Sequence, residues 1–235
     1  MQLPGFGLIG GTSWHATALY YRLINQAVNN HFGNNTNPPL SVYTLNQAAI
    51  HRFQENNQWY KIENLFVDAG KRLIKAGAEG LAFCANTPHK CFDSVQAKLE
   101  VPLLHIADVT AQTLQKQRIL KAAFIGTRFS MTEAFMQQRY GAHDIELICP
   151  TELATIHKLH QIITQSLSMG HTKPHEKEFV IDVVQSLISK GARAVVLGCT
   201  EFSLLVSAKD FSIPVMDTTV LHAQAISQWI LQHDL

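Results

Sequence analysis

A cysteine inside a Gly-Cys-Thr-Glu run is the strongest chemical signal in this sequence of 235 residues. Cys199 follows the apolar segment Ala194–Leu197, which we expect to be a buried strand, and the turn after it reads as a helix start. A thiol at such a turn lies near backbone N–H groups and the positive end of a helix dipole, which favour the thiolate. Most free cysteines are small buried residues, but this position at a strand end predicts a catalytic acid/base.

A related turn occurs earlier, where the predicted strand Gly80–Phe83 runs into a Cys-Ala-Asn-Thr turn at residues 84–87. The amide of Asn86 and the hydroxyls of Thr87 and Thr200 can donate hydrogen bonds to a carboxylate, as main-chain N–H groups can. A Gly-Gly-Thr-Ser turn at residues 10–13 follows another apolar segment, and we expect its backbone N–H groups to line the same site. Together these turns predict a site for a small carboxylate.

Segments of the first half of the chain recur in the second half. Three pairs match in the same order, at offsets of 116, 114 and 112 residues: Phe6–Gly10 with Ala122–Gly126, Leu73–Ala78 with Leu187–Ala192, and Val101–Leu104 with Ile213–Met216. This internal repeat predicts two copies of one β-turn-α-β-α-β-α-β unit. At the offset of 114 residues, Cys199 corresponds to Ala85 rather than to Cys84.

Short apolar segments without strict alternation are typical of parallel strands that are buried on both faces. They lie at Phe6–Ile9, Leu40–Leu45, Gly80–Phe83, Val101–His105, Ala122–Ile125, Asp144–Ile148, Ala194–Leu197 and Ile213–Met216. Helical segments lie at Ala16–Asn29, Trp59–Ala76, Val109–Gln117, Ser130–Tyr140, Leu153–Met169, Glu176–Lys190 and Val220–Leu231. The alternation predicts an α/β fold of two similar lobes, each with a mainly parallel sheet flanked by helices. Since ligands bind beyond the carboxyl ends of such strands, we expect the active site in the cleft between the lobes.

Composition excludes several classes of protein. Lys+Arg 19 against Asp+Glu 18 leaves a net charge of +1, which provides no basic surface for a nucleic-acid backbone. The apolar runs are far shorter than the roughly 20 residues of a membrane helix. Four cysteines in a chain of this size do not form a disulfide framework. We therefore expect a cytoplasmic enzyme with a small-molecule substrate and with neither a nucleic-acid nor a membrane partner.

Cofactor and metal signals are weak. Residues 5–10 match a dinucleotide-binding glycine pattern, but the glycines bracket the strand instead of following it, and no ribose-binding acid lies about 20 residues further on. The histidine pairs His157/His160 and His171/His175 have no Cys or carboxylate cluster at ligand spacing beside them. We therefore predict no cofactor and no metal.

Four motifs, spread over essentially the whole chain, resemble those of the aspartate/glutamate racemase family. They are Gly7–Trp14 with Tyr20 and Tyr21, Ala85–Lys90, Gly126–Arg128 and Leu197–Glu201. The chain is most similar to the aspartate/glutamate-specific branch, because the glutamate racemases of cell-wall synthesis usually carry His where this chain has Glu201. The resemblance implies a cofactor-independent amino-acid racemase in which two opposed cysteines transfer the α-proton of aspartate or glutamate.

The resemblance also implies an organisation and a set of site residues. The C-terminal helix returns to the first lobe, so we place the first lobe at residues 1–105 plus 211–235 and the second at residues 106–210. A homodimer is implied. The expected substrate-binding residues are Thr12, Ser13, Arg52, Ala85, Asn86, Thr87, Thr127, Thr200 and Glu201. Arg52 and Arg128 are the candidates for holding a side-chain carboxylate, although exposure at the surface is the commoner fate of arginine.

The sequence departs from the family pattern at the first cysteine. The residue immediately before Asn86 is Ala85, which cannot transfer a proton. Cys84 should point away from the cleft, since neighbouring side chains of a strand face opposite ways. A β-bulge could re-aim it, which makes Cys84 the second catalytic candidate.

Three functions therefore stay open. The first is a racemase that uses Cys199 and an unidentified second group. The second is a one-cysteine relative, similar to arylmalonate decarboxylase, which protonates a planar intermediate from one face. The third is a catalytically silent homologue that binds carboxylates.

Overall fold

The structure of the protein is a computed structural model that describes residues 3–233. Each predicted strand is present within these residues, although the fourth is reduced to two residues. The strands are β1 (Phe6–Gly10), β2 (Leu40–Thr44), β3 (Gly80–Phe83), β4 (Leu103–Leu104), β5 (Lys121–Gly126), β6 (Glu146–Ile148), β7 (Val195–Gly198) and β8 (Val215–Asp217).

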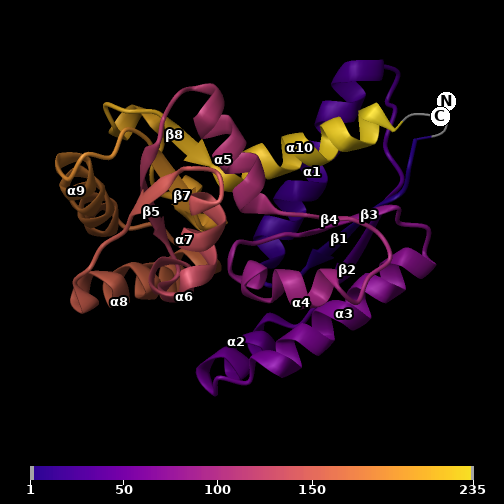
Figure 1. The fold of residues 1–235 in the computed structure, drawn as a ribbon, viewed down its shortest axis with the longest axis horizontal. Helices are drawn as coiled ribbons and strands as arrows, with labels where there is room; N and C mark the ends of the chain where they lie inside the picture. The colour runs from indigo at the N-terminus through magenta and orange to yellow at the C-terminus, as the bar shows by residue number, and fades with distance from the viewer. Residues whose placement is uncertain (1–2, 234–235) are drawn as a thin grey trace. The chain divides into compact units, whose positions relative to one another are not determined.

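The strands form two four-stranded sheets in which the pairings are parallel. One sheet has the order β2-β1-β3-β4 and the other has the order β6-β5-β7-β8, so the two sheets have the same topology. Helices flank both sheets (Figure 1). The predicted α/β fold with two similar parallel sheets is confirmed.

Helices connect the strands, and most of them match the predicted helical segments. They are α1 (Trp14–Phe32), α2 (Gln47–Glu55), α3 (Trp59–Lys75), α4 (Phe92–Gln96), α5 (Ile106–Lys116), α6 (Arg128–Thr132), α7 (Ala134–Gly141), α8 (Leu153–Gln161), α9 (Pro174–Ser189) and α10 (Thr218–Gln232). The sequence analysis did not predict α2 and α4. The predicted helix Ser130–Tyr140 is divided into α6 and α7, because Glu133 has an extended backbone with φ −92° and ψ 150°.

The first sheet separates two apolar cores. On one face, Leu81 and Phe83 of β3 pack with residues of α3 such as Phe66. On the other face, Ala82 and Cys84 pack with residues of α1 and α10. Figure 1 shows α1 and α10 on one side of this sheet and α3 and α4 on the other. Successive residues of β3 therefore enter different cores, as expected of a strand buried on both faces.

The second sheet lies within one continuous core, to which α5, α7, α8 and α9 contribute buried residues. Phe124 of β5 is fully buried there. A Cβ atom on Gly198 would lie 2.2 Å from the Phe124 ring, so only glycine fits at this place. The residue before Cys199 is therefore fixed by core packing.

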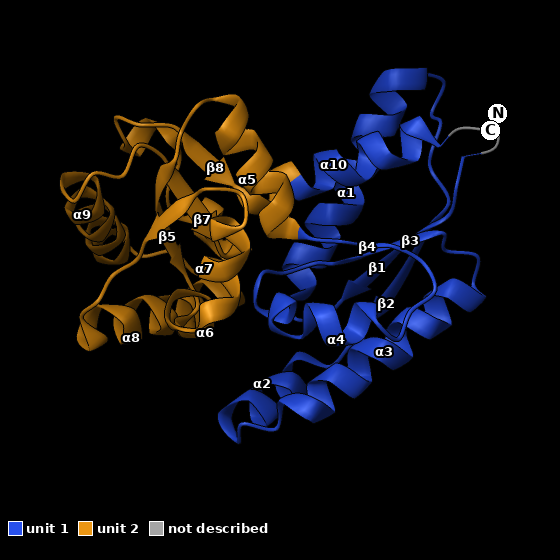
Figure 2. Cartoon of the chain, in the orientation of Figure 1, with its two compact units in different colours: residues 1–105, 222–235 blue, residues 106–221 orange. Residues whose placement is uncertain are grey.

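The chain divides into two compact units, residues 1–105 with 222–235 (unit 1) and residues 106–221 (unit 2), as Figure 2 shows. We expected the second boundary after Asp210. The structure places it after Leu221, because β8 pairs with β7 and so belongs to the sheet of unit 2. Helix α10 begins in unit 2, and Ile226 and Ile230 of this helix are buried in a core of unit 1. No helix within residues 3–233 is long and apolar enough to span a membrane.

Candidate active site

Each sheet has a topological switch point between its two central strands. In unit 1 the chain passes from β1 to β2 on one side and from β3 to β4 on the other, so the turns after β1 and β3 are neighbours at the carboxyl edge. The turns after β5 and β7 are the corresponding pair in unit 2. Ligands of open α/β sheets bind at such points. Apart from Arg52, the predicted site residues lie in these four turns.

The turn after β1 is closed by contacts within the protein. Gly11 has φ 86°, and a Cβ atom there would lie 2.1 Å from the carbonyl oxygen of Leu45, so the turn requires glycine. The N–H of Gly11 donates to Oγ1 of Thr17 at 3.0 Å, and Oγ of Ser13 caps the first turn of α1. The N–H of Gly11, which belongs to the turn whose N–H groups we expected to line the site, is therefore bound to Thr17 in this structure. Thr12 is half-buried beside it.

Cys84 lies in the core and not at the site. Its N–H donates to the carbonyl of Ile9 at 3.1 Å, which continues the β1–β3 ladder without the bulge that would re-aim the side chain. The thiol packs with Ala82 in the core formed with α1 and α10, and its residue is 1% exposed. Burial raises the pKa of the Cys84 thiol far above its usual value. Cys84 is therefore unsuited to the acid/base role for which it was a candidate.

Ala85 takes the place that corresponds to Cys199. Ile9 pairs with Phe83 in the first sheet and Ile125 pairs with Leu197 in the second. Counting two residues onward from Phe83 and from Leu197 gives Ala85 and Cys199, in agreement with the sequence repeat. Unit 1 thus presents a methyl group where unit 2 presents a thiol.

Asn86 and Thr87 are buried at the start of the 3₁₀ helix η1 (Thr87–Cys91). The side chain of Asn86 makes no capping hydrogen bond to η1. Both residues lie in the turn after β3, where the sequence predicted donors for a carboxylate.

His89 is a further residue of this turn, and its side chain is buried. Its Nδ1 atom lies 3.0 Å from the carbonyl oxygen of Ala85 and 3.2 Å from that of Asn86. Because carbonyl oxygens only accept, Nδ1 carries the hydrogen. The spacing of three and four residues within a helical turn is the signal that could have indicated these contacts.

In unit 2, the turn after β5 holds Thr127 and Arg128. Oγ1 of Thr127 accepts a hydrogen bond from the N–H of Ser130 at 3.4 Å, and so caps α6. The half-buried guanidinium of Arg128 lies 4.0 Å from the centroid of the Phe129 ring, a cation–π contact. Thr127 thus has a structural contact in addition to its expected place at the site.

The turn after β7 brings Cys199, Thr200 and Glu201 into one hydrogen-bonded cluster. The thiol of Cys199 donates to Oε2 of Glu201 at 2.9 Å, and the hydroxyl of Thr200 donates to the same oxygen at 2.5 Å. The three residues are buried, with 6–8% of their surface exposed. The Thr200 hydroxyl, which we expected to donate to a ligand, donates to Glu201 in this structure.

The electrostatics of this cluster differ from the expectation of a stabilised thiolate. Burial raises the pKa of Cys199 well above its usual value, and the neighbouring carboxylate of Glu201 raises it further. Hydrogen bonds from the backbone N–H groups of Glu201 and Thr200 act in the opposite direction but are outweighed. The resting site therefore holds Cys199 as a thiol, which is a proton donor.

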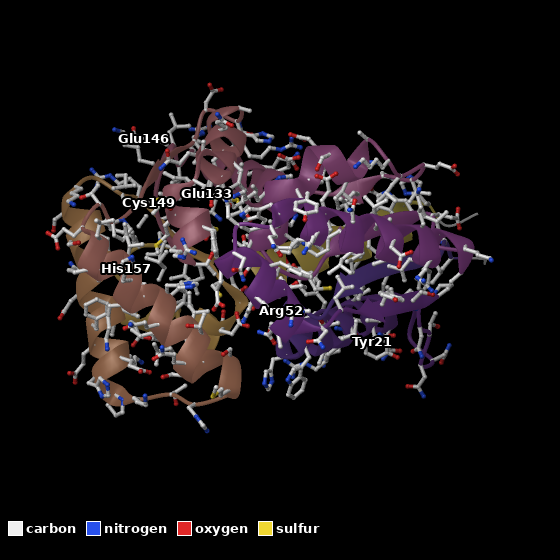
Figure 3. All side chains as sticks on the ribbon, turned by 90° about the horizontal axis from the view of Figure 1, so that it is seen from below. Tyr21, Arg52, Glu133, Glu146, Cys149 and His157 are labelled. Carbon is white, nitrogen blue, oxygen red and sulfur yellow. The ribbon has the colours of Figure 1, made fainter. Side chains whose placement is uncertain are left out.

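Arg52 lies in the last turn of α2, away from the four turns in the sequence, and its side chain is at the surface of unit 1 (Figure 3). Its guanidinium lies 5.6 Å from the centroid of the Phe53 ring. Among residues 3–233, no group of three or more His, Cys, Asp or Glu side chains could hold a metal ion.

Comparison with known proteins identifies the family of this chain. The family model of the Asp/Glu/Hydantoin racemases matches residues 9–226, which include all four turns. The chain belongs to the Asp/Glu/Hydantoin racemase family. Its predicted assignment to the amino-acid racemases is confirmed.

Solved structures and a curated relative agree with this family. A Yersinia pestis structure described as a candidate Asp/Glu racemase is 36% identical, covers 98% of this chain and 100% of its own, and superimposes with a TM-score of 0.91. An aspartate racemase homologue from Pyrococcus horikoshii OT3 is 30% identical, with coverage of 97% and 100% and a TM-score of 0.84. The broad specificity amino-acid racemase RacX of Bacillus subtilis is 24% identical over 169 residues, 70% of each chain.

Proposed function

We propose that this racemase-family enzyme interconverts the enantiomers of an acidic amino acid, aspartate or glutamate, without a cofactor, and that Cys199 is one of its two acid/base groups. The observation that carries the proposal is the thiol of Cys199, held 2.9 Å from the carboxylate of Glu201 at the switch point of unit 2. Racemisation by α-proton transfer requires one group on each face of the substrate that can donate and accept a proton.

The proposed reaction passes through a planar intermediate. The thiolate of Cys199 removes the α-proton of one enantiomer, which leaves an enolate-like carbanion conjugated with the α-carboxylate. The second acid/base group, which is not assigned to a residue, then donates a proton to the opposite face of the carbanion, which gives the other enantiomer and leaves Cys199 protonated and the second group deprotonated. In the reverse direction the thiol of Cys199 supplies the proton, and this is the protonation state that the resting site favours.

Glu201 has a proposed role in both directions. Its Oε2 atom accepts the thiol hydrogen and so orients it. When Cys199 must act as a base, the same oxygen is the nearest acceptor for the thiol proton. The substrate-binding role first expected for Glu201 is thus replaced by contact with the thiol.

We propose that the remaining residues of the four turns hold the substrate. Asn86 and Thr87 of unit 1 and Thr127 of unit 2 supply hydrogen-bond donors for the α-carboxylate, where negative charge builds up as the α-proton leaves. The racemases named above support an amino-acid substrate, and Arg52 and Arg128 stay candidates for the side-chain carboxylate.

Ala85 favours a second candidate function. The methyl group at this position cannot transfer a proton, and Cys84 beside it is in the core. An enzyme with Cys199 alone would add or remove a proton at one face, as in a one-sided decarboxylase or exchange reaction. A silent carboxylate-binding homologue is the third outcome.

One experiment separates these functions. Each enantiomer of aspartate and glutamate is incubated with the protein in deuterated water, and α-deuterium and configuration are followed by NMR. Exchange with inversion is expected for the racemase. Exchange with retention alone would indicate the one-sided enzyme, and no exchange of any of the four compounds would contradict the proposal.

The homodimer, the cytoplasmic location and the absence of a nucleic-acid partner stay predictions.

A further inference from the structure

His89 holds the turn after β3 by three hydrogen bonds. Its backbone N–H donates to the carbonyl of Asn86 at 3.0 Å. Its ring Nδ1–H is shared between the carbonyls of Ala85, at 3.0 Å, and Asn86, at 3.2 Å. One residue thus fixes the two peptide groups that precede the Asn86 and Thr87 side chains.

The ring of His89 is itself fixed by aromatic neighbours. Its centroid lies 5.3 Å from that of Phe83, with the rings perpendicular, and 6.0 Å from that of Phe92, with the rings nearly parallel. The ring of His105 lies 4.4 Å away. His89 is 3% exposed, so water has little access to replace the Nδ1–H donor. The position of the turn is therefore determined by how this imidazole packs.

The second copy of the repeat is held differently. The offset of 114 residues places Ser203 where unit 1 has His89. The hydroxyl of Ser203 donates to Oδ2 of Asp217, at the end of β8, and the residue is exposed. Only in unit 1 does this side chain bond to the carbonyls of its own turn. The difference between the copies points to a requirement of the unit 1 turn.

We propose that His89 is a positioning residue that aligns the Asn86 amide and the Thr87 hydroxyl with the substrate carboxylate. This inference rests on the proposed function, in which those two side chains bind that carboxylate. Without the Nδ1–H donor, the half-buried carbonyl of Ala85 loses its hydrogen bond from His89, and the turn would move to find another partner. The donors would then no longer converge on the ligand.

The test compares His89→Leu with His89→Asn. Leucine fills part of the space between the aromatic neighbours of His89 but has no hydrogen-bond donor. The asparagine amide, in contrast, can place an N–H near the position of Nδ1. The readouts are kcat and KM for α-proton exchange and the Kd for succinate, an inert dicarboxylate. Because these donors bind the carboxylate in the ground state and also stabilise the negative charge that builds up on it as the α-proton leaves, the loss should appear both as a higher KM and as a lower kcat. We expect His89→Leu to raise KM and Kd about tenfold or more, and His89→Asn to recover most of that loss.

Controls separate this result from unfolding and from failure of the proposed function. All proteins are assayed well below their measured unfolding midpoints, and His31→Leu, an exposed site in the last turn of α1, serves as the matched control. If His89→Leu keeps the wild-type KM and Kd, or if His89→Asn is as impaired as His89→Leu, the positioning role is wrong while the proposed function stands. A wild-type protein that neither binds succinate nor exchanges acidic amino acids overturns both.

Discussion

Replacement of Glu201 by glutamine tests the chemistry of unit 2 most directly. The carboxylate accepts hydrogen bonds from Cys199 at 2.9 Å and from Thr200 at 2.5 Å. Glutamine keeps the size and one acceptor oxygen but carries no charge. A negative charge beside a thiol disfavours the thiolate, so Glu201→Gln should lower the pKa of Cys199.

The geometry sets the scale of this effect. At the 2.9 Å separation of Sγ and Oε2, two unit charges repel by about 6 kcal/mol in an effective dielectric of about 20. Glu201→Gln should recover only part of this repulsion energy as a lower pKa of Cys199. The burial that raises the pKa persists in the variant, and the glutamine oxygen still accepts the thiol hydrogen. A tenfold change in the thiolate fraction needs about 1.4 kcal/mol. We therefore expect the thiolate fraction to rise at least about tenfold at any pH at which Cys199 is mostly protonated in both proteins.

The assay is the ultraviolet absorbance of the thiolate during a pH titration. Subtracting the matching Cys199→Ser protein removes the signal of the other cysteines and tyrosines. Thr200→Val is the control, since it removes the other donor to the same carboxylate oxygen but leaves the charge, and it should not lower the pKa. A Glu201→Gln curve that coincides with the wild type, or moves to higher pH, would refute the reasoning.

Three further predictions follow from the same structure. Cys199→Ser replaces the thiol by a hydroxyl with a much higher pKa, so α-proton exchange should fall at least about a hundredfold, and wild-type exchange rates in this variant would disprove the assignment. Ala85→Cys should speed racemisation of aspartate or glutamate while Cys84→Ala changes little; the reverse pattern in the NMR assay would mean that Cys84 reaches the substrate. Burial and the nearby His89 lower the pKa of His222 from 6.5 to about 3, so the unfolded chain binds a proton in this range that the folded chain does not. The free energy of unfolding in urea should therefore fall as pH drops from about 6.5 toward 3, and His222→Gln should flatten this dependence; equal slopes for the two proteins would contradict it.

The strands were predictable from the sequence, whereas some helices were not. Buried parallel strands need unbroken apolar runs, and each such run did form a strand within residues 3–233. In contrast, α2 is a short helix of mainly polar residues in which only Ile50 is buried. Its N-cap is Asn46, whose side chain accepts hydrogen bonds from two backbone N–H groups of the first turn. A short, exposed helix of this kind is stabilised by its cap and its surroundings, which an apolar pattern does not record.

The positions of the four turns were also predictable, but the protonation and the hydrogen-bond partners of their side chains were not. Parallel strands bring the turns after them to one edge, so residue order and the repeat suffice to place Ala85 and Cys199 at equivalent positions. The pKa of Cys199 depends on burial and on which way the Glu201 side chain turns, and neither can be read from a Gly-Cys-Thr-Glu run. The contacts of His89 likewise depend on the direction of its ring within an aromatic cage.

The two copies of the repeat carry different residues at equivalent positions, and these differences indicate different functions for the two units. Unit 2 has Cys199 and its carboxylate partner, which can give up or accept a proton. Unit 1 has Ala85 in the same place and keeps its turn fixed by the buried imidazole of His89. We infer that unit 1 mainly binds and orients the substrate, and that proton transfer depends mainly on unit 2. The ratio of inversion to total α-proton exchange measures how unequally the two units take part in proton transfer. An acid/base group added on the second face of the substrate raises the rate of inversion more than the rate of exchange. Ala85→Cys should therefore increase that ratio, whereas changes to Glu201 should alter the exchange rate and leave the ratio as it is.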